Sequence, residues 1–237
     1  MGVKIKWESA IKPLIKKYRK NPHPLKNHNL YECIVMVILS AQSSDDYINK
    51  IAPALFDEFP DLNSLAKAKD EQVYPFVKGV IGHVKKIKYL TDIAKQLKSN
   101  KNIPVTMEAL IALPGIGRKS ANVIMREAGV KAEGIVVDLH TVRVATRLGI
   151  SKSDEPKKIE QDCMKNIDEK DWGEAGMAMS FLGREICRPK PLCPECLMND
   201  VCQFYLRGGY EKLQKELAKP KGKKTKLSEK PVRKGRW

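Results

Sequence analysis

The sequence predicts an all-α fold. Along most of the chain, apolar residues recur at the three- and four-residue spacing of amphipathic helices. The alternating pattern of a β-strand is scarce: residues 134–137 form the only short candidate, and we interpret them as a connection. Proline and glycine clusters separate the helical stretches, as expected for helices joined by short turns.

The predicted helices follow one another through the chain. Trp7, Ile11, Leu14 and Tyr18 lie at helical spacing in the first segment, which ends before a proline-rich break at 21–24. Residues 30–41 are almost continuously apolar, which predicts a buried central helix. Further helices are predicted at 47–59, 70–78, 85–97, 107–112, 118–128, 138–148, 155–167 and 172–187.

Composition favours a globular intracellular protein. Apolar residues make up 42% and charged residues 30% of the 237 residues, a balance typical of folded domains. No apolar run approaches the roughly 20 residues that a membrane-spanning helix needs. The first residues lack an apolar signal core with a cleavage site, so we expect a protein of the cytoplasm or nucleoid that does not associate with membranes.

The chain is strongly basic. Forty-four Lys and Arg against 28 Asp and Glu give a net charge of +16. Such an excess attracts polyanions such as nucleic acid, but it is equally compatible with a solubilising surface. Half of it lies in residues 218–237, which hold nine Lys or Arg and one Glu. We therefore predict a mobile basic tail over 206–237.

The most informative local segment is a turn between two predicted helices. Pro114, Gly115 and Gly117 interrupt the helical pattern, and Arg118 opens the next helix. Pro ends the first helix, and glycines permit backbone geometries that other residues resist. They also let a phosphate approach the amides at the helix N-terminus. Lys119 follows at once, either as a solvated helix lysine or as a functional amine.

Asp138 changes the interpretation of that lysine. It lies nineteen residues after Lys119, at the end of an apolar run and the start of a predicted helix. A carboxylate there can simply cap the helix. Facing Lys119 across a cleft, it could instead help the amine attack C1′ of a deoxynucleotide and stabilise the positive charge that develops on the sugar.

The two segments LPGIGRKSANV and VVDLHTVRVATRLG resemble the helix–hairpin–helix/Gly-Pro-Asp superfamily of DNA glycosylases, and within it endonuclease III. The resemblance implies that Lys119 is the Schiff-base lysine and Asp138 the catalytic aspartate. It also implies that Gly115, Gly117 and Arg118 contact the DNA backbone. Relatives that only remove the base carry another residue at the lysine position, so Lys119 favours the branch that also cuts the strand.

Two further turns match less closely. Residues 38–45 resemble the LLSAQATD segment of endonuclease III, which implies that Gln42 fills the gap left by an extruded base. The apolar wedge of the family's GLYN-like turn falls on His83, a planar ring in place of an apolar side chain. We expect His83 to contact DNA by stacking, with an ordinary surface histidine as the alternative.

Four cysteines lie within sixteen residues near the end of the folded part. Cys187, Cys193, Cys196 and Cys202 have the spacing C-x5-C-x2-C-x5-C, which suits either zinc or an iron–sulfur cluster. The resemblance favours a [4Fe–4S] cluster, although its usual first gap is one residue longer. Arg188 and Lys190 in the shortened gap are expected to reach DNA phosphates.

The resemblance also implies an architecture and a reaction. It predicts two helical lobes with the DNA cleft between them: a six-helix barrel at 23–133, and a cluster-bearing lobe formed by 1–22 and 134–205. It predicts a monomer that removes oxidised pyrimidines from double-stranded DNA and cuts the resulting abasic sites. A mismatch or adenine glycosylase and a non-catalytic iron–sulfur DNA-binding protein are the alternatives.

Overall fold

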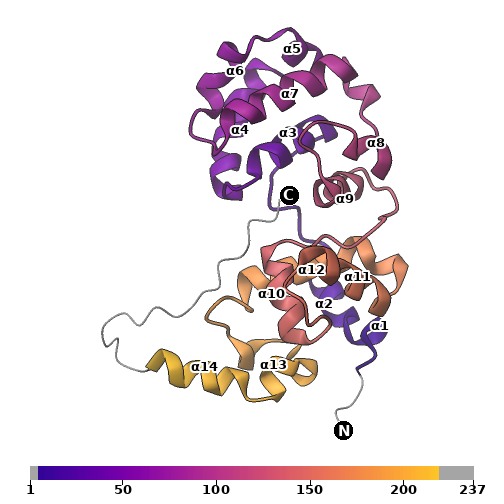
Figure 1. Cartoon of the computed structure of the whole chain (residues 1–237), viewed down its shortest axis with the longest axis vertical. Helices are drawn as coiled ribbons and strands as arrows, with labels where there is room; N and C mark the ends of the chain where they lie inside the picture. The colour runs from indigo at the N-terminus through magenta and orange to yellow at the C-terminus, as the bar shows by residue number, and fades with distance from the viewer. Residues whose placement is uncertain (1–4, 219–237) are drawn as a thin grey trace. The chain divides into compact units, whose positions relative to one another are not determined.

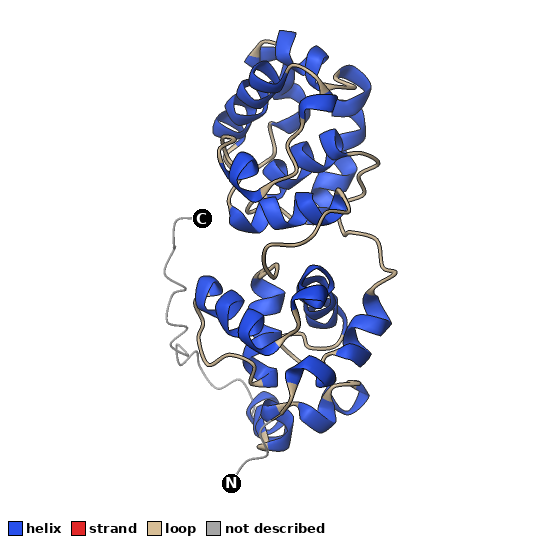
Figure 2. Ribbon diagram, turned by 90° about the vertical axis from the view of Figure 1, so that its right-hand side faces the viewer, coloured by secondary structure: helices blue, strands red, loops and turns tan. Residues whose placement is uncertain are grey.

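The computed structural model describes residues 5–218, and residues 1–4 and 219–237 lie outside the description. All regular structure in the described part is helical, which confirms the predicted fold class (Figure 2). Contacts within the chain divide it into two compact units. One spans Arg19–Val136, and the other joins the residues up to Tyr18 with those from Val137 onwards.

The unit Arg19–Val136 is built around α3, Leu30–Ser40 (Figure 1). Eight of its eleven residues are buried, as expected from its continuous apolar sequence, and Asn29 caps its first turn by accepting a hydrogen bond from Glu32 N. Helices α4, α7 and α9 contact it. The remaining helices are α4 Asp45–Glu58, α5 Leu62–Lys67, α6 Asp70–Val77, α7 His83–Leu97, α8 Met107–Ile111 and α9 Arg118–Glu127.

The second unit is centred on the crossing of α10, Leu139–Leu148, with α12, Trp172–Glu185. Gly183 permits this close approach, because a Cβ there would lie 2.8 Å from the His140 Cβ. Tyr18 stacks on Phe181 with ring centroids 5.6 Å apart, which joins the N-terminal segment to α12. The other helices are α1 Trp7–Ala10, α2 Lys12–Tyr18, α11 Pro156–Asn166, α13 Gln203–Leu206 and α14 Gly209–Ala218.

Helix α14 lies within the stretch predicted to be the basic tail. The sequence predicted a mobile basic tail over 206–237, and residues 209–218 of this stretch form a helix. Tyr210, Leu213 and Leu217 recur at helical spacing there, and the Tyr210 ring lies 6.0 Å from that of Tyr205 in α13. The rest of the expected tail, 219–237, lies outside the described residues.

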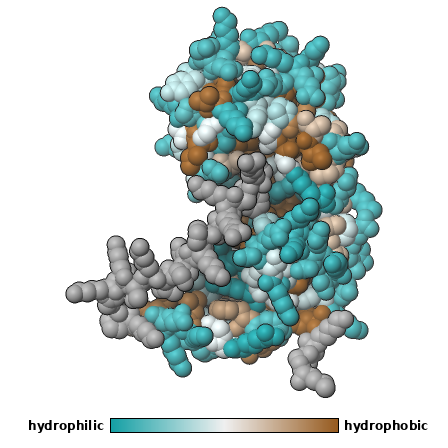
Figure 3. All heavy atoms as spheres, viewed as in Figure 1, coloured by the Kyte–Doolittle hydropathy of each residue, from teal (hydrophilic) through white to brown (hydrophobic). Residues whose placement is uncertain are grey.

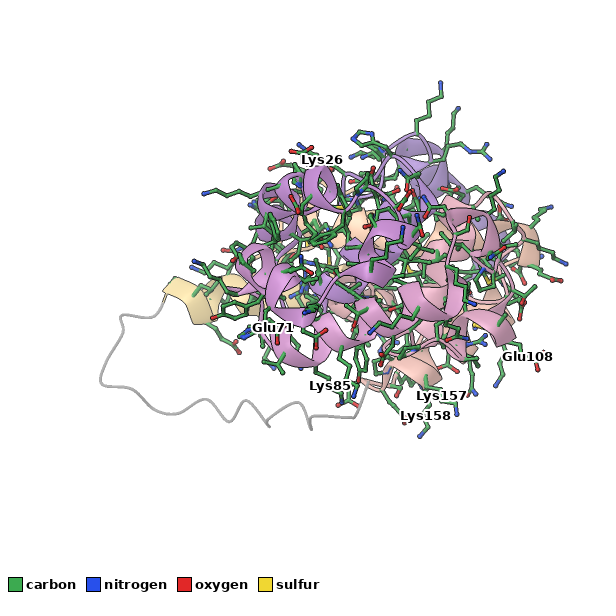
Figure 4. All side chains as sticks on the ribbon, turned by 90° about the horizontal axis from the view of Figure 1, so that it is seen from above. Lys26, Glu71, Lys85, Glu108, Lys157 and Lys158 are labelled. Carbon is green, nitrogen blue, oxygen red and sulfur yellow. The ribbon has the colours of Figure 1, made fainter. Side chains whose placement is uncertain are left out.

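Charged and polar residues cover most of the described surface in Figure 3. Lys157 and Lys158 on α11 point away from the ribbon in Figure 4, whereas Ile159 beside them is fully buried. Within residues 5–218, every helix is too short or too polar to be a membrane span.

Candidate active site and metal centre

The predicted hairpin is a tight turn between α8 and α9. Leu113 and Ile116 are buried and anchor it to the unit. Gly115 has φ +81°, and a Cβ at this position would lie 2.4 Å from the Tyr89 ring. Glycine is therefore required there by both backbone geometry and space.

Gly117 has a different environment. It is the N-cap of α9 with φ −98°, an ordinary extended conformation, and a Cβ would meet nothing within 4 Å. The expectation that both glycines serve the backbone geometry is therefore correct only for Gly115. At Gly117 the missing side chain leaves open space in front of the first amides of α9, where an anion is favoured.

Lys119 is the second residue of α9, and its side chain is exposed beside the hairpin. Arg118 before it is also exposed, and its guanidinium donates to the Glu133 carbonyl at 2.8 Å. That bond ties the start of α9 to the connection that leads out of the unit. An amine placed here is accessible to a large substrate such as DNA.

Asp138 is the N-cap of α10 in the other unit. Its Oδ1 accepts hydrogen bonds from His140 N at 2.9 Å and Thr141 N at 2.7 Å. Its Oδ2 accepts from Ser180 Oγ at 2.6 Å and lies 3.8 Å from the Arg184 guanidinium. All these partners stabilise a negative, fixed carboxylate. Capping therefore does occur, and it leaves a further role open because the two roles are compatible.

The remaining predicted DNA contacts of the unit Arg19–Val136 lie on two turns. Gln42 is exposed directly after α3 and has φ +62°, which is unusual for a residue other than glycine. His83 begins α7, and it is only half exposed. Its Nδ1 lies 3.2 Å from the Val80 carbonyl, and its ring is tilted against that of Tyr74 at 5.5 Å. The exposed apolar side chains beside it are Ile81 and Val84.

All four predicted ligand cysteines line one cavity in the second unit. The cavity holds about 350 Å³, open space at its mouth included. Leu148, Leu182 and Ile186 give it an apolar lining around the thiols. The four cysteines that line this cavity are Cys187, Cys193, Cys196 and Cys202.

Burial acts strongly on these thiols. Together with the neighbouring cysteines, it raises the pKa of Cys193 to about 12, and burial also raises the pKa values of Cys196 and Cys202. A bound cation would reverse this preference, because metals bind the thiolate and release the proton. Cys33 and Cys163 are buried in α3 and α11, outside this cavity.

Two arginines of α10 hold the loop that carries Cys187, and the sequence analysis did not single them out. Arg143 Nε donates to the Cys187 carbonyl at 2.7 Å. Arg147 donates to the Arg188 carbonyl at 2.7 Å, lies 3.5 Å from the Cys187 sulfur and stacks over Phe204. Their spacing of four residues on one helix face was the available signal. Arg188 and Lys190 on this loop are both exposed.

Comparison with known proteins identifies the family. The model of the HhH-GPD superfamily of base excision DNA repair proteins matches residues 35–169. Endonuclease III of Synechocystis sp. is 35% identical and aligns over 72% of this chain and 80% of its own length. Endonuclease III of Thermotoga maritima is 32% identical over 85% of this chain and 94% of its own length. The chain belongs to the endonuclease III family.

Solved structures agree with this family assignment. A non-covalent endonuclease III–DNA complex superposes with a TM-score of 0.74 at 29% identity, covering 83% of this chain and 94% of its own. A trapped endonuclease III–DNA covalent intermediate matches with the same TM-score at 28% identity, covering 84% and 94%. Lys119 and Asp138 lie in different units of this family member, so the candidate pair is divided between them.

Proposed function

We propose that this chain excises oxidised pyrimidines from duplex DNA and then cuts the strand, with Lys119 as the nucleophile. The observation that carries the proposal is the amine itself: an exposed lysine follows the glycine hairpin in a member of the endonuclease III family. A relative's trapped covalent intermediate with DNA supports a reaction in which an enzyme–DNA bond forms. The chain is therefore a DNA glycosylase with AP lyase activity.

The reaction divides the work between an amine and a carboxylate. In its neutral form, Lys119 Nζ attacks C1′ of the damaged nucleotide, and the glycosidic bond breaks with its electrons leaving on the base, which takes up a proton. Asp138 stays ionised and stabilises the positive charge that develops on the sugar. Its capping amides and Ser180 hold the carboxylate in one orientation, so no reorganisation is needed during the step.

Strand cleavage follows from the amine adduct. The sugar ring opens, and Lys119 and C1′ form a protonated imine, which acidifies the C2′ proton. Loss of that proton sends electrons into the C2′–C3′ bond and breaks the C3′–O bond, which releases the 3′ strand as a phosphate leaving group. Water then hydrolyses the imine and regenerates the amine.

We further propose that the four cysteines hold a [4Fe–4S] cluster. All four line one cavity, and their spacing within sixteen residues suits a metal centre. Four thiolates could also hold a single zinc ion, and membership of the endonuclease III family is what favours the cluster. Such a cluster would brace the loop of Arg188 and Lys190 and takes no part in the sugar chemistry.

The cofactor proposal is tested by the composition of the purified protein. Iron and acid-labile sulfide in a ratio near one, four of each per chain, is the expected result. One zinc per chain without sulfide would show instead that the cysteines hold a single zinc ion. Substituting Cys196 by Ser should lower the bound metal in either case.

The enzymatic proposal is tested by borohydride trapping on a duplex that contains thymine glycol. We expect a covalent adduct with the unaltered chain and none with Lys119→Gln. Lys88→Gln, which removes an exposed lysine of α7, is the matched control and should still be trapped. Base release without trapping would instead identify a glycosylase that lacks lyase activity. DNA binding with neither product, on thymine glycol and on abasic sites, would leave only the non-catalytic alternative.

A further inference from the structure

Lys86 is an unusual lysine because it is buried. Its side chain is only 8% exposed, although lysines are seldom buried without a specific partner. The ammonium donates to two backbone carbonyls, those of Leu39 at 2.9 Å and of Ala41. Burial lowers the pKa of Lys86 to about 8, so the group remains mostly protonated at neutral pH.

These two carbonyls lie at the C-terminal end of α3. The last carbonyls of a helix have no partner within the helix, and they form the negative end of its dipole. An ammonium is the matching group, since it brings positive charge and up to three donors. Lys86 therefore fixes the end of α3 from a different helix, α7.

The segment that Lys86 fixes leads directly into the strained turn of Gln42. A left-handed backbone is unfavourable for a residue other than glycine, and it persists only when its surroundings impose it. Ala41, whose carbonyl Lys86 binds, immediately precedes Gln42. On the other side the turn is closed by Ser43 N donating to Ser40 O at 2.9 Å, and Ser44 caps α4.

Lys86 also belongs to the turn that carries His83. Its own backbone N donates to Gly82 O at 3.1 Å in the first turn of α7, and Gly82 has φ +71°. Its neighbour Lys85, labelled in Figure 4, is exposed on the same helix. Lys86 thus links the turn that carries Gln42 with the turn that carries His83, both of them predicted DNA contacts.

We propose that Lys86 is a positioning residue for base extrusion: it holds the Gln42 turn in its strained conformation, in register with the His83 turn. The proposal rests on the proposed function, because it gives Gln42 the task of occupying the space that the damaged base leaves. Lys86 itself touches no DNA in this scheme. Its effect passes through the two carbonyls at the end of α3.

The test measures extrusion separately from chemistry. Lys119→Gln serves as the background, so that no covalent step follows, and 2-aminopurine beside thymine glycol reports unstacking by its fluorescence. In this background, Lys86→Met should lower the equilibrium constant for extrusion of the damaged base by about 10- to 100-fold. Misplacing a group in a site by about 1 Å can cause a loss of this size. Lys86→Arg, which keeps the charge and the donors, should restore most of the signal.

Two controls separate positioning from simple loss of charge or stability. Lys88→Met removes an exposed lysine from the same helix and should leave the signal unchanged. Circular dichroism confirms that each variant is folded; if Lys86→Met is not, Lys86→Gln takes its place, because its amide can still donate to one carbonyl.

A double-mutant cycle with Gln42→Ala tests whether Lys86 acts on extrusion through the Gln42 turn. If Lys86 acts through the Gln42 turn, Lys86→Met should cause no further loss once Gln42 has been replaced. An equal loss with and without Gln42 would overturn the proposal, as would a folded Lys86→Met variant that behaves like Lys88→Met. Failure of the proposed function would appear elsewhere, as absent trapping by the unaltered chain on an abasic site.

Discussion

At the scale of single residues, one substitution can separate the helix-capping role of Asp138 from the catalytic role that we propose for it. Asparagine caps helices about as well as aspartate, whereas alanine loses about 1 kcal/mol. We therefore expect Asp138→Asn to unfold at nearly the same denaturant concentration as the unaltered chain. Its rate of base release should fall by at least about 100-fold, since the carboxylate charge is gone.

Asp138→Ala completes the comparison, because it removes both the cap and the charge. It should lose about 1 kcal/mol of stability and show the same catalytic defect. The measurements are urea unfolding and single-turnover base release from thymine glycol duplexes. Full activity in Asp138→Asn would show that Asp138 only caps the helix and takes no part in base release.

The two hairpin glycines predict opposite outcomes for the same substitution. Gly115→Ala places a Cβ at φ +81° against Tyr89, so it should destabilise the fold by about 1–3 kcal/mol. Gly117→Ala meets nothing in the protein, and its melting temperature should change little. It should instead weaken duplex binding several-fold, because the methyl group lies where a phosphate would approach. Equal DNA affinity in the unaltered chain and in Gly117→Ala would show that no phosphate binds in front of α9 at Gly117.

His83 and Val84 form a second contrasting pair. The His83 ring is held by Val80 O and Tyr74, whereas Val84 is 73% exposed. We expect Val84→Ser to weaken binding of lesion-containing duplex more than His83→Ala does, since an exposed apolar side chain gains most from entering a base stack. Binding isotherms on lesion-containing and undamaged duplexes measure the two losses. A larger loss of affinity in His83→Ala would instead favour stacking of the His83 ring on DNA.

At the scale of elements, the sequence predicted the long amphipathic helices well, because their apolar spacing alone defines the buried face. The six-residue α5, Leu62–Lys67, was missed, since so short a segment carries hardly two turns of pattern. Helix α14 was hidden by its charged composition. Among the proposed site residues, Lys119, Asp138 and the cysteines were recognisable from motifs.

Contacts to backbone atoms could not be predicted in the same way. Arg143, Arg147 and Lys86 all act on main-chain carbonyls, and those carbonyls belong to segments distant in sequence. No residue type marks a carbonyl that lacks a partner, so such contacts emerge only from the three-dimensional arrangement.

The missed helix α5 yields a pH prediction. Asp61 caps it by accepting from Ser64 N at 2.7 Å, and this hydrogen bond lowers the pKa of the carboxyl below its ordinary value of about 3.9. A lowered pKa means that the stabilisation is complete above that ordinary value and is lost as pH falls through the folded-state pKa. Asp61→Ala should therefore cost about 1 kcal/mol at pH 7.

The difference between Asp61→Ala and the unaltered chain should shrink as pH falls below about 4. Urea unfolding at pH 7, 5 and 3.5 measures it, with Asp57→Ala, which removes an exposed carboxylate nearby, as the matched control. A difference that stays constant over this range would show that the cap depends on packing and not on the charge of Asp61.

At the scale of the whole molecule, the charge is unevenly shared between the described part and the end of the chain. Residues 219–237 carry nine Lys or Arg and one Glu, a net +8 of the total +16. They lie outside the described residues, so an expectation about them rests on charge alone. Contacts between basic side chains and phosphates supply affinity that depends on salt and not on sequence or damage.

Deleting residues 219–237 should therefore weaken DNA binding without changing lesion preference. The logarithm of the association constant falls with that of the salt concentration by about 0.9 for each neutralised phosphate, so the slope should become shallower by up to about 7. The ratio of affinities for thymine glycol and undamaged duplex should stay the same, because the residues proposed to recognise the lesion all lie within 5–218. An unchanged slope would mean that the basic end does not reach DNA, and a lower ratio would give it a part in recognition.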